Sequence, residues 1–354
     1  MDYKRSKKTS PPRAFWEIDA DALVSNVKEI ARFAGKKVIA VVKANAYGHG
    51  ARLIAPLFDR LPQVEFLAVA TPDEGKNLRL LGVKKPILLL SGFFKEELPS
   101  VKEYNLTPVV SDREQLLLAV RNRIPYHLNI DTGMGRLGFL KPPYGLLKIF
   151  PPQGVMTHFP SAEVDRKFTL KQIEVFKRLI RPLRVKYIHL QNSAGLAYKV
   201  PFANLVRVGL SLYGEYGNKD LKGVLNLKFP SRIGARILEV RRLQKGSCIS
   251  YGCRYRLKKN SYVGVIAFGY ADGFMRCLSN RAVVYYRGKP YPVAGNITMD
   301  LTAVVFGKTK PRAGEYVEIV NHRQRFSDLA SLCGTIPYEI MTRIGERVSR
   351  YLKG

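Results

Sequence analysis

The chain has 354 residues, and its length and 46% hydrophobic content suit one large domain plus a smaller one. Its 59 Lys and Arg residues against 28 Asp and Glu residues give a net charge of +31, which raises non-specific affinity for nucleic acid or anionic surfaces. The basic residues are spread along the whole chain without a recognition motif, and no apolar run is long enough to span a bilayer. We therefore expect no specific nucleic-acid partner and no membrane insertion.

The N-terminal residues predict a cytoplasmic protein. This location determines whether we expect its cysteines to be reduced or to form disulfides. Residues 1–13 are basic and lack the apolar core of a secretion signal, so they predict a flexible tail. The cysteines form no CxxC pair and have no histidine at metal-ligand spacing. Because cytosolic proteins rarely keep disulfides, we expect reduced thiols and no metal site. The four cysteines are Cys248, Cys253, Cys277 and Cys333.

Short apolar runs dominate the first two thirds of the chain. Residues 38–42 are mostly β-branched, which is typical of a strand buried on both faces of a parallel sheet. Seven similar runs follow at intervals of about 20 to 30 residues, with helical periodicity between them. Eight strand–helix units predict a (β/α)8 TIM-type barrel over residues 14–228, with an open doubly wound sheet as the alternative. The seven later runs are residues 66–70, 87–91, 107–111, 126–131, 154–158, 187–192 and 205–209.

The ends of these runs carry the candidate functional residues, because the carboxyl ends of barrel strands build the active site. Lys43 ends the first run, where limited exposure would lower the pKa of its amine and make it a nucleophile toward aldehydes. The alternative is a lysine whose side chain extends into solvent. Ser193 and Gly209, after the seventh and eighth strands, are typical of a phosphate site. Together these residues indicate a phosphorylated aldehyde cofactor such as pyridoxal phosphate.

The pattern changes near residue 229 to short strands joined by tight turns. Helical segments follow at residues 326–332 and 338–349. This part predicts a mainly β C-terminal domain with terminal helices over residues 229–354. Its predicted strands are residues 232–240, 247–250, 262–267, 281–286, 291–293, 301–306 and 315–320.

Nine motifs follow one another along nearly the whole chain. In this order, and with this two-domain layout, the chain resembles the alanine racemase family of fold-type III pyridoxal-phosphate enzymes. The motifs are VVKANAYGHG (residues 41–50), DTGMGRLG (131–138), THF (157–159), NSAG (192–195), RVG (207–209), LYG (212–214), SYG (250–252), GYADG (269–273) and MD (299–300).

The resemblance implies an isomerase that interconverts L-alanine and D-alanine, with pyridoxal phosphate held as an aldimine on Lys43. Racemisation needs one base on each face of the Cα atom. The family pattern implies Lys43 on one face and, on the other, Tyr251 from the second subunit of a homodimer. D-alanine would serve as a peptidoglycan precursor. The alternatives are a racemase of broader or serine specificity, a decarboxylase on the same scaffold, a non-catalytic carrier of pyridoxal phosphate, and a nucleic-acid-binding protein.

The resemblance also implies the binding residues. Arg207 would face the pyridine nitrogen, backed by His158, and a guanidinium cannot readily give up a proton, so that nitrogen would stay unprotonated. The substrate carboxylate would meet Arg136, in a charge-assisted pair, and the backbone amide of Met299. The residues implied for the phosphate are Tyr47, Ser193, Gly209 and Leu210.

Two positions depart from the family pattern. Asn129 stands where many relatives carry a carbamylated lysine that orients the arginine equivalent to Arg136, and asparagine cannot be carbamylated. Our hypothesis is a bound anion, such as chloride, next to Asn129 and Arg136. Glu346 stands where some relatives place a tyrosine that helps to bind the phosphate. A carboxylate would repel phosphate, so we expect Glu346 to point elsewhere.

Overall fold

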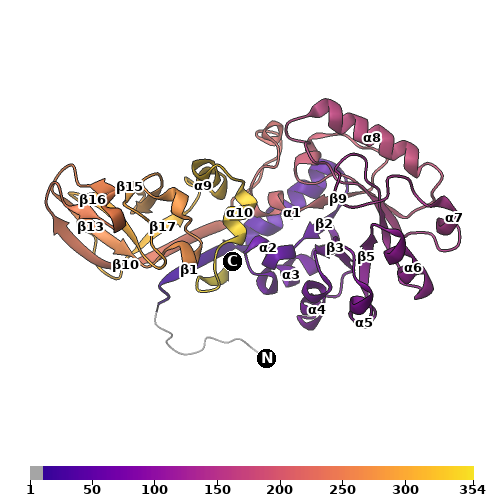
Figure 1. Cartoon of the computed structure of the whole chain (residues 1–354), viewed down its shortest axis with the longest axis horizontal. Helices are drawn as coiled ribbons and strands as arrows, with labels where there is room; N and C mark the ends of the chain where they lie inside the picture. The colour runs from indigo at the N-terminus through magenta and orange to yellow at the C-terminus, as the bar shows by residue number, and fades with distance from the viewer. Residues whose placement is uncertain (1–10) are drawn as a thin grey trace. The chain divides into compact units, whose positions relative to one another are not determined.

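The computed structural model describes residues 11–354, which form two compact units (Figure 1). One unit contains residues 20–230, and the other contains residues 11–19 and 231–354. Most of the tail predicted over residues 1–13 lies outside the described residues. Among residues 11–354, no helix has the length and apolar character that a membrane crossing requires.

The first unit is a closed barrel of eight parallel strands, as predicted. The strands pair in chain order, and the last one pairs back with the first. Val38 to Val41 are buried, which explains why this strand reads as a continuous apolar run. The barrel strands are β2 (Lys37–Val41), β3 (Val64–Val69), β4 (Ile87–Leu89), β5 (Leu106–Val110), β6 (His127–Asn129), β7 (Gly154–Met156), β8 (Tyr187–His189) and β9 (Leu205–Val208).

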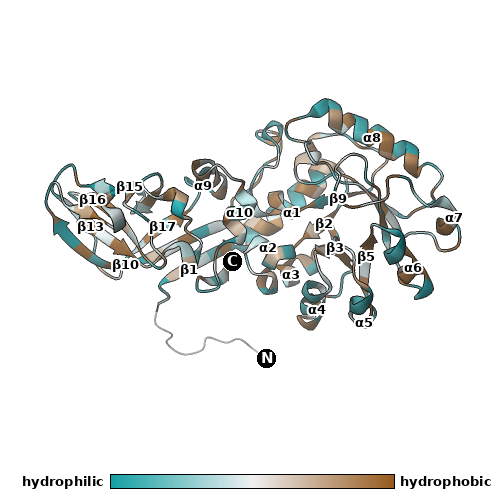
Figure 2. Cartoon of the chain, viewed as in Figure 1, coloured by the Kyte–Doolittle hydropathy of each residue, from teal (hydrophilic) through white to brown (hydrophobic). Residues whose placement is uncertain are grey.

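Helices surround the barrel strands (Figure 1). Besides the short segment after β2, they are α1 (Ala20–Ala34), α3 (Ala51–Asp59), α4 (Pro72–Leu80), α5 (Leu98–Glu103), α6 (Arg113–Arg121), α7 (Tyr144–Leu147) and α8 (Arg166–Ile180). The side chains of Thr71, Asp112 and Asp165 cap the first turns of α4, α6 and α8. Helix α8 alternates hydrophobic and hydrophilic stretches, as an amphipathic helix on a barrel should (Figure 2). Single 3-10 turns are η1 (Lys95–Glu97), η2 (Ala194–Ala197), η3 (Leu210–Tyr213) and η4 (Lys219–Leu221).

The second unit is mainly β, as predicted. Its sheet has the strand order β13-β16-β15-β14-β17-β10-β1-β18, and β13 also pairs with β10. The strands are β1 (Ala14–Asp19), β10 (Ser231–Leu243), β13 (Ser261–Ile266), β14 (Val283–Tyr286), β15 (Lys289–Ala294), β16 (Thr302–Gly307), β17 (Tyr316–Val320) and β18 (Ser349–Lys353). A small hairpin joins β11 (Cys248–Ile249) to β12 (Tyr255–Arg256). The helical segments are η5 (Tyr251–Cys253), η6 (Tyr270–Asp272), η7 (Arg276–Leu278), α9 (Phe326–Cys333) and α10 (Pro337–Thr342).

Two strands at the ends of the chain differ from the prediction. The predicted barrel range begins at residue 14, but residues 14–19 form β1, which pairs antiparallel with β10 and parallel with β18. The predicted last helix ran to residue 349, but α10 ends at Thr342 and β18 follows. Both strands are defined by partners far away in sequence, so the local pattern carries little signal for them.

The expectation of reduced thiols is wrong for this structure. Cys248 pairs with Cys253 and Cys277 pairs with Cys333, with Cα–Cα distances of 5.1 Å and 5.3 Å. Both distances lie in the range that a disulfide allows. The fold brings the partners together through the β11 hairpin in one case and through η7 and α9 in the other, which cysteine spacing alone does not reveal.

Candidate active site

Lys43 lies at the end of β2, where the chain enters an unusual turn. Ala44, Asn45, Ala46 and Tyr47 all have φ between 50° and 54°, so the segment assigned as α2 (Lys43–Tyr47) is mostly a left-handed turn. This conformation costs about 1–2 kcal/mol for each residue with a Cβ atom, so the surrounding structure must hold it.

Glu74, on α4, provides this support. One carboxylate oxygen accepts a hydrogen bond from the amide of Ala44 and the other from the amide of Ala70, both at 2.7 Å. The side chain of Asn45 in turn accepts a hydrogen bond from the amide of Ala51, at the start of α3. Glu74 is not among the residues predicted from the sequence. Its position three residues after Thr71 is typical of a capping pair, but its carboxylate holds the Lys43 turn instead.

Lys43 lines a cavity of about 200 Å³ within the barrel unit. The charged and polar residues that share this cavity include Ser91, Asp131, Arg136, His158 and Arg207. Burial, followed by the positive charge of Arg136, lowers the pKa of Lys43, while Glu74 opposes this shift. The amine is therefore deprotonated at a lower pH than an exposed lysine, which favours its use as a nucleophile.

Arg207, on β9, is 3% exposed and is held by two imidazoles. Its Nη1 donates to Nδ1 of His189 and its Nη2 to Nδ1 of His158, both at 2.9 Å. A guanidinium can only donate, so both histidines must present an unprotonated Nδ1. Burial lowers the pKa of both imidazoles, which agrees with neutral rings. The pKa of Arg207 is lowered by burial to about 10, so it stays cationic at neutral pH.

The hydrogen-bond chain continues into the barrel core. Nε2 of His189 lies 2.8 Å from Nδ1 of His127. Because Nδ1 of His189 accepts from Arg207, its proton must be on Nε2, and His127 must accept it. The proton of His127 is then on its own Nε2, which has no partner among the described residues. His127 and His189 are not among the predicted site residues, although a histidine inside an apolar strand is a signal that could identify them.

The residues predicted to bind a phosphate come together at the start of η3. The Ser193 hydroxyl accepts hydrogen bonds from the amides of Gly209 (3.3 Å) and Ser211 (3.2 Å), and Leu210 lies between these two residues in the chain. A Cβ atom at Gly209 would overlap the Tyr47 hydroxyl. The Ser211 hydroxyl is buried and has no partner among the described residues. Backbone amides, hydroxyls and an unpaired buried donor suit a phosphate group.

Arg136 lies on the loop that follows β6. The Asp131 carboxylate shapes this loop by accepting hydrogen bonds from three backbone amides. These belong to Gly133, Met134 and Gly135, at 2.8, 2.7 and 2.8 Å. Asn129 holds the same loop, because its side-chain nitrogen donates to the Leu137 carbonyl (2.9 Å) and to the Ser111 hydroxyl (3.2 Å). Both amide hydrogens of Asn129 are therefore engaged.

The remaining predicted residues lie in the second unit. Tyr251 is 76% exposed and Met299 is 55% exposed, so both are available to another molecule. Tyr251 belongs to η5, between β11 and β12, and its carbonyl accepts a hydrogen bond from Asn296. Glu346 is exposed.

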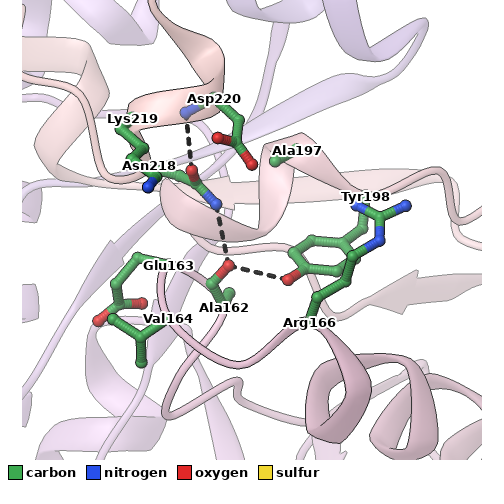
Figure 3. A pocket seen from close by; sticks show the side chains of 9 residues that line it. All are labelled: Ala162, Glu163, Val164, Arg166, Ala197, Tyr198, Asn218, Lys219 and Asp220. Atoms are coloured by element: carbon green, nitrogen blue, oxygen red, sulfur yellow. Dashed lines mark hydrogen bonds between the residues drawn. The ribbon is translucent and has the colours of Figure 1, made fainter.

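A second hollow of the barrel unit, of about 350 Å³, contains none of the predicted residues (Figure 3). The Ala162 carbonyl accepts hydrogen bonds from the hydroxyl of Tyr198 and from the side chain of Asn218, both at 2.9 Å. Arg166 stacks on the ring of Tyr198. The candidate site is the cavity that contains Lys43, where predicted residues lie together.

The fold and the site define a class of protein in which a closed parallel barrel, with a buried lysine in a cavity shared with two arginines, is followed by a mainly β unit. Residues 18–217 match the family model for the alanine racemase N-terminal domain, and residues 231–352 match the model for the alanine racemase C-terminal domain. The chain belongs to the alanine racemase family. It is therefore an isomerase.

Individual relatives agree over nearly the full length. The alanine racemase of Aquifex pyrophilus is 46% identical over 339 residues, which covers 96% of this chain and 98% of the relative. The crystal structure of alanine racemase from E. faecalis has a TM-score of 0.90 at 31% identity and covers 97% of this chain and 98% of its own. The structure from Bartonella henselae, which has covalently bound pyridoxal phosphate, has a TM-score of 0.88 at 28% identity and covers 97% and 100%.

Proposed function

We propose that this protein interconverts L-alanine and D-alanine with pyridoxal phosphate as its cofactor. The observation that carries the proposal is the cavity in which Lys43, with its lowered pKa, lies together with Arg207, fixed by neutral histidines. Relatives named alanine racemase and the covalent cofactor of the Bartonella henselae structure support it. A broader specificity that includes serine is the second candidate.

The residues present fit this cofactor. Lys43 would bind its aldehyde, and Tyr47, Ser193 and the amides of Gly209 and Leu210 would bind its phosphate. When bound, the cofactor supplies an electron-withdrawing ring that acidifies the Cα–H bond of the amino acid.

Arg207 would meet the ring nitrogen. Its two Nη groups are taken by His189, His158 and the Thr157 carbonyl, which leaves the Nε–H. This donor does not readily surrender its proton, so it would keep the ring nitrogen unprotonated and limit the electron demand of the ring.

Two bases would move the proton. The Lys43 amine would serve one face of Cα and the Tyr251 phenol the other. A phenol is a poor base at neutral pH unless positive charge favours the phenolate, and Arg136 and Arg207 provide such charge in the cavity. Arg136 and the amide of Met299 would orient the substrate carboxylate.

We propose a homodimer in which each site combines Lys43 of one subunit with Tyr251 and Met299 of the other. The exposure of Tyr251 and Met299 in the single chain supports this arrangement. The family implies a cytoplasmic enzyme that supplies D-alanine as a peptidoglycan precursor, although two disulfides are unusual for that compartment.

We further propose that an anion such as chloride lies beside Arg136 and provides the negative charge that a carbamylated lysine supplies in relatives. Both amide hydrogens of Asn129 are engaged with Ser111 and Leu137. Arg136 would therefore bind the anion, and Asn129 would hold the loop that carries Arg136.

Mixed dimers test the function and the shared site together. Lys43→Ala should lose the visible absorbance of the lysine-bound cofactor. Tyr251→Phe should keep this absorbance but lose racemisation, which is measured by polarimetry on L-alanine and L-serine. Unfolding and refolding the two inactive variants together should restore about a quarter of wild-type activity, because half of random dimers are mixed and each has one intact site.

If the Tyr251→Phe variant still racemises alanine, Tyr251 is not a base in the reaction. If the refolded mixture recovers no activity, the two subunits do not share their active sites.

The same polarimetric assay in sodium gluconate instead of sodium chloride tests the anion. Equal rates in the two salts would count against chloride.

A further inference from the structure

The Cys248–Cys253 disulfide encloses Tyr251. It joins the first residue of β11 to the last residue of η5, so the segment between its cysteines contains Tyr251. The hairpin that carries this segment is short, with only the pairs Cys248–Arg256 and Ile249–Tyr255 between β11 and β12. A two-stranded ladder of this length is barely stable by itself.

The two sides of this segment are anchored differently. On the β11 side, Ile249 is 4% exposed and packs in the apolar cluster of Leu257, Val263 and Ala294. The Ser250 hydroxyl donates to the Asn296 carbonyl at 2.6 Å, and the Asn296 side chain donates to the Tyr251 carbonyl at 2.9 Å. These bonds hold the backbone before and at Tyr251.

The side after Tyr251 has weaker support. Gly252, Cys253 and Arg254 are exposed, and the Cys253 amide makes only a long hydrogen bond, of 3.4 Å, to the Ser250 carbonyl. Ser250, Gly252 and Cys253 have φ of 61°, 72° and 49°, a conformation that is unfavourable for the serine and the cysteine. The disulfide ties this side back to β11.

We propose that the Cys248–Cys253 disulfide positions Tyr251 for proton transfer, so that Cys248 and Cys253 are positioning residues of the reaction. This inference rests on the proposed role of Tyr251 as a base. A general base must come within hydrogen-bond reach of its proton, and a displacement of about 1 Å can lower a rate about 100-fold. Closing a short segment with a covalent bond removes most of the conformations in which an exposed phenol would miss its target.

Reduction should therefore slow the enzyme. A dithiol reductant donates two electrons and two protons to the Cys248–Cys253 bond, which breaks to two thiols, while the reductant closes to its own disulfide. The released segment would keep its anchors at Ile249 and Asn296 but lose its tie at Cys253.

The second disulfide provides a matched control. Cys277 and Cys333 belong to the same unit and link η7 to α9, and Tyr251 lies outside the segment that they close. Loss of this bond tests the general effect of removing a disulfide from the unit.

The test compares three proteins: wild type, Cys248→Ser/Cys253→Ser and Cys277→Ser/Cys333→Ser. Rates are measured on the holoenzymes, and hydrogen exchange is measured on the cofactor-free proteins. We expect the first variant to lose about tenfold in kcat with KM nearly unchanged. The deuterium isotope effect at Cα should rise with L-alanine, whose proton Tyr251 removes, and fall with D-alanine. Hydrogen exchange of residues 248–256 in the cofactor-free protein should become faster. The control variant should leave all three readouts at the wild-type level.

Wild-type kcat and isotope effects in the Cys248→Ser/Cys253→Ser variant would overturn the proposal, as would native wild-type protein in which Cys248 and Cys253 titrate as free thiols. If that variant fails to fold, the folded Cys277→Ser/Cys333→Ser holoenzyme is treated with the dithiol reductant instead. Among the two disulfides it retains only Cys248–Cys253, so unchanged kcat and isotope effects after reduction would equally overturn the proposal. The Tyr251→Phe variant distinguishes the failure of the two proposals. If this variant racemises alanine, Tyr251 is not a base. If it is inactive while the Cys248→Ser/Cys253→Ser variant matches wild type, Tyr251 remains the base and only the positioning role of the disulfide is rejected.

Discussion

The reactivity of Lys43 depends on its neighbours in the cavity. Burial and the charge of Arg136 lower the pKa of its amine, and Glu74 partly offsets them. The charges of Arg136 and Arg207 both lower the pKa of Lys43 and so favour its unprotonated form.

This leads to a prediction on pH. In cofactor-free protein, trapping of acetaldehyde on Lys43 by borohydride should increase with pH and level off with a midpoint below the ordinary lysine value of 10.5. Arg136→Gln removes the second cause of the shift, so the midpoint should move to higher pH. Mass spectrometry of the labelled peptide measures it. Arg113→Gln, at an exposed position on α6, is the control, and an unchanged midpoint in Arg136→Gln would contradict the electrostatic account.

At this scale the sequence identifies residues that end strands or carry recognisable motifs, such as Lys43 and Arg207. It misses His127, His189 and Glu74, because their roles depend on atoms from other strands and helices. The tautomer of His127 is fixed by Arg207 through His189, and no pattern near residue 127 contains that information.

The left-handed turn after β2 is the element on which the site depends most. Four consecutive residues with positive φ would not form such a turn in isolation. The Glu74 carboxylate, which accepts two amide hydrogen bonds, ties the turn to α4 and to the end of β3. The sequence predicts the strand and the helix on either side, but the turn itself arises from tertiary contacts.

Glu74→Gln should therefore weaken the turn. Glutamine offers one carbonyl oxygen and would direct an NH2 group toward a backbone N–H, so one charge-assisted hydrogen bond is lost. We expect a loss of about 2 kcal/mol in the free energy of unfolding and faster hydrogen exchange at residues 44–47. Urea denaturation and exchange mass spectrometry measure the two effects. Glu114→Gln, on the exposed face of α6, should change neither, and equal effects of both substitutions would show that Glu74 has no special role.

The two units of the molecule are not two consecutive stretches of its sequence, because residues 11–19 belong to the same unit as residues 231–354. Strand β1 belongs to the sheet of the C-terminal unit, where Trp16 is fully buried against Phe326 and beside Arg350. Glu17 forms hydrogen bonds with residues 215 and 334 positions later. Eight recurring apolar runs made the barrel predictable, whereas β1 and β18 were not predicted because their partners lie far away in sequence. The disulfides were not predicted because cytosolic proteins rarely keep them.

Because the chain has a single tryptophan, Trp16 on β1, its fluorescence reports the unfolding of the second unit separately from that of the barrel. Ile18 on β1 and Ile39 on β2 are both fully buried, so truncating either to alanine should cost about 2–5 kcal/mol. In urea titrations, Ile18→Ala should lower the midpoint of the Trp16 fluorescence transition, and Ile39→Ala should lower that of cofactor absorbance. If both substitutions shift both signals equally, the two units unfold as one.

The pairing of β1 with β18 also constrains how the protein is made. Residues 14–19 leave the ribosome before the barrel residues, but their parallel neighbour, residues 349–353, is translated only after the whole barrel. The barrel of residues 20–230 can begin to fold during synthesis, while one edge of β1 must wait until β18 has been translated. A nascent chain cut short before residue 349 would carry an unmatched strand edge, which is the kind of surface that chaperones recognise.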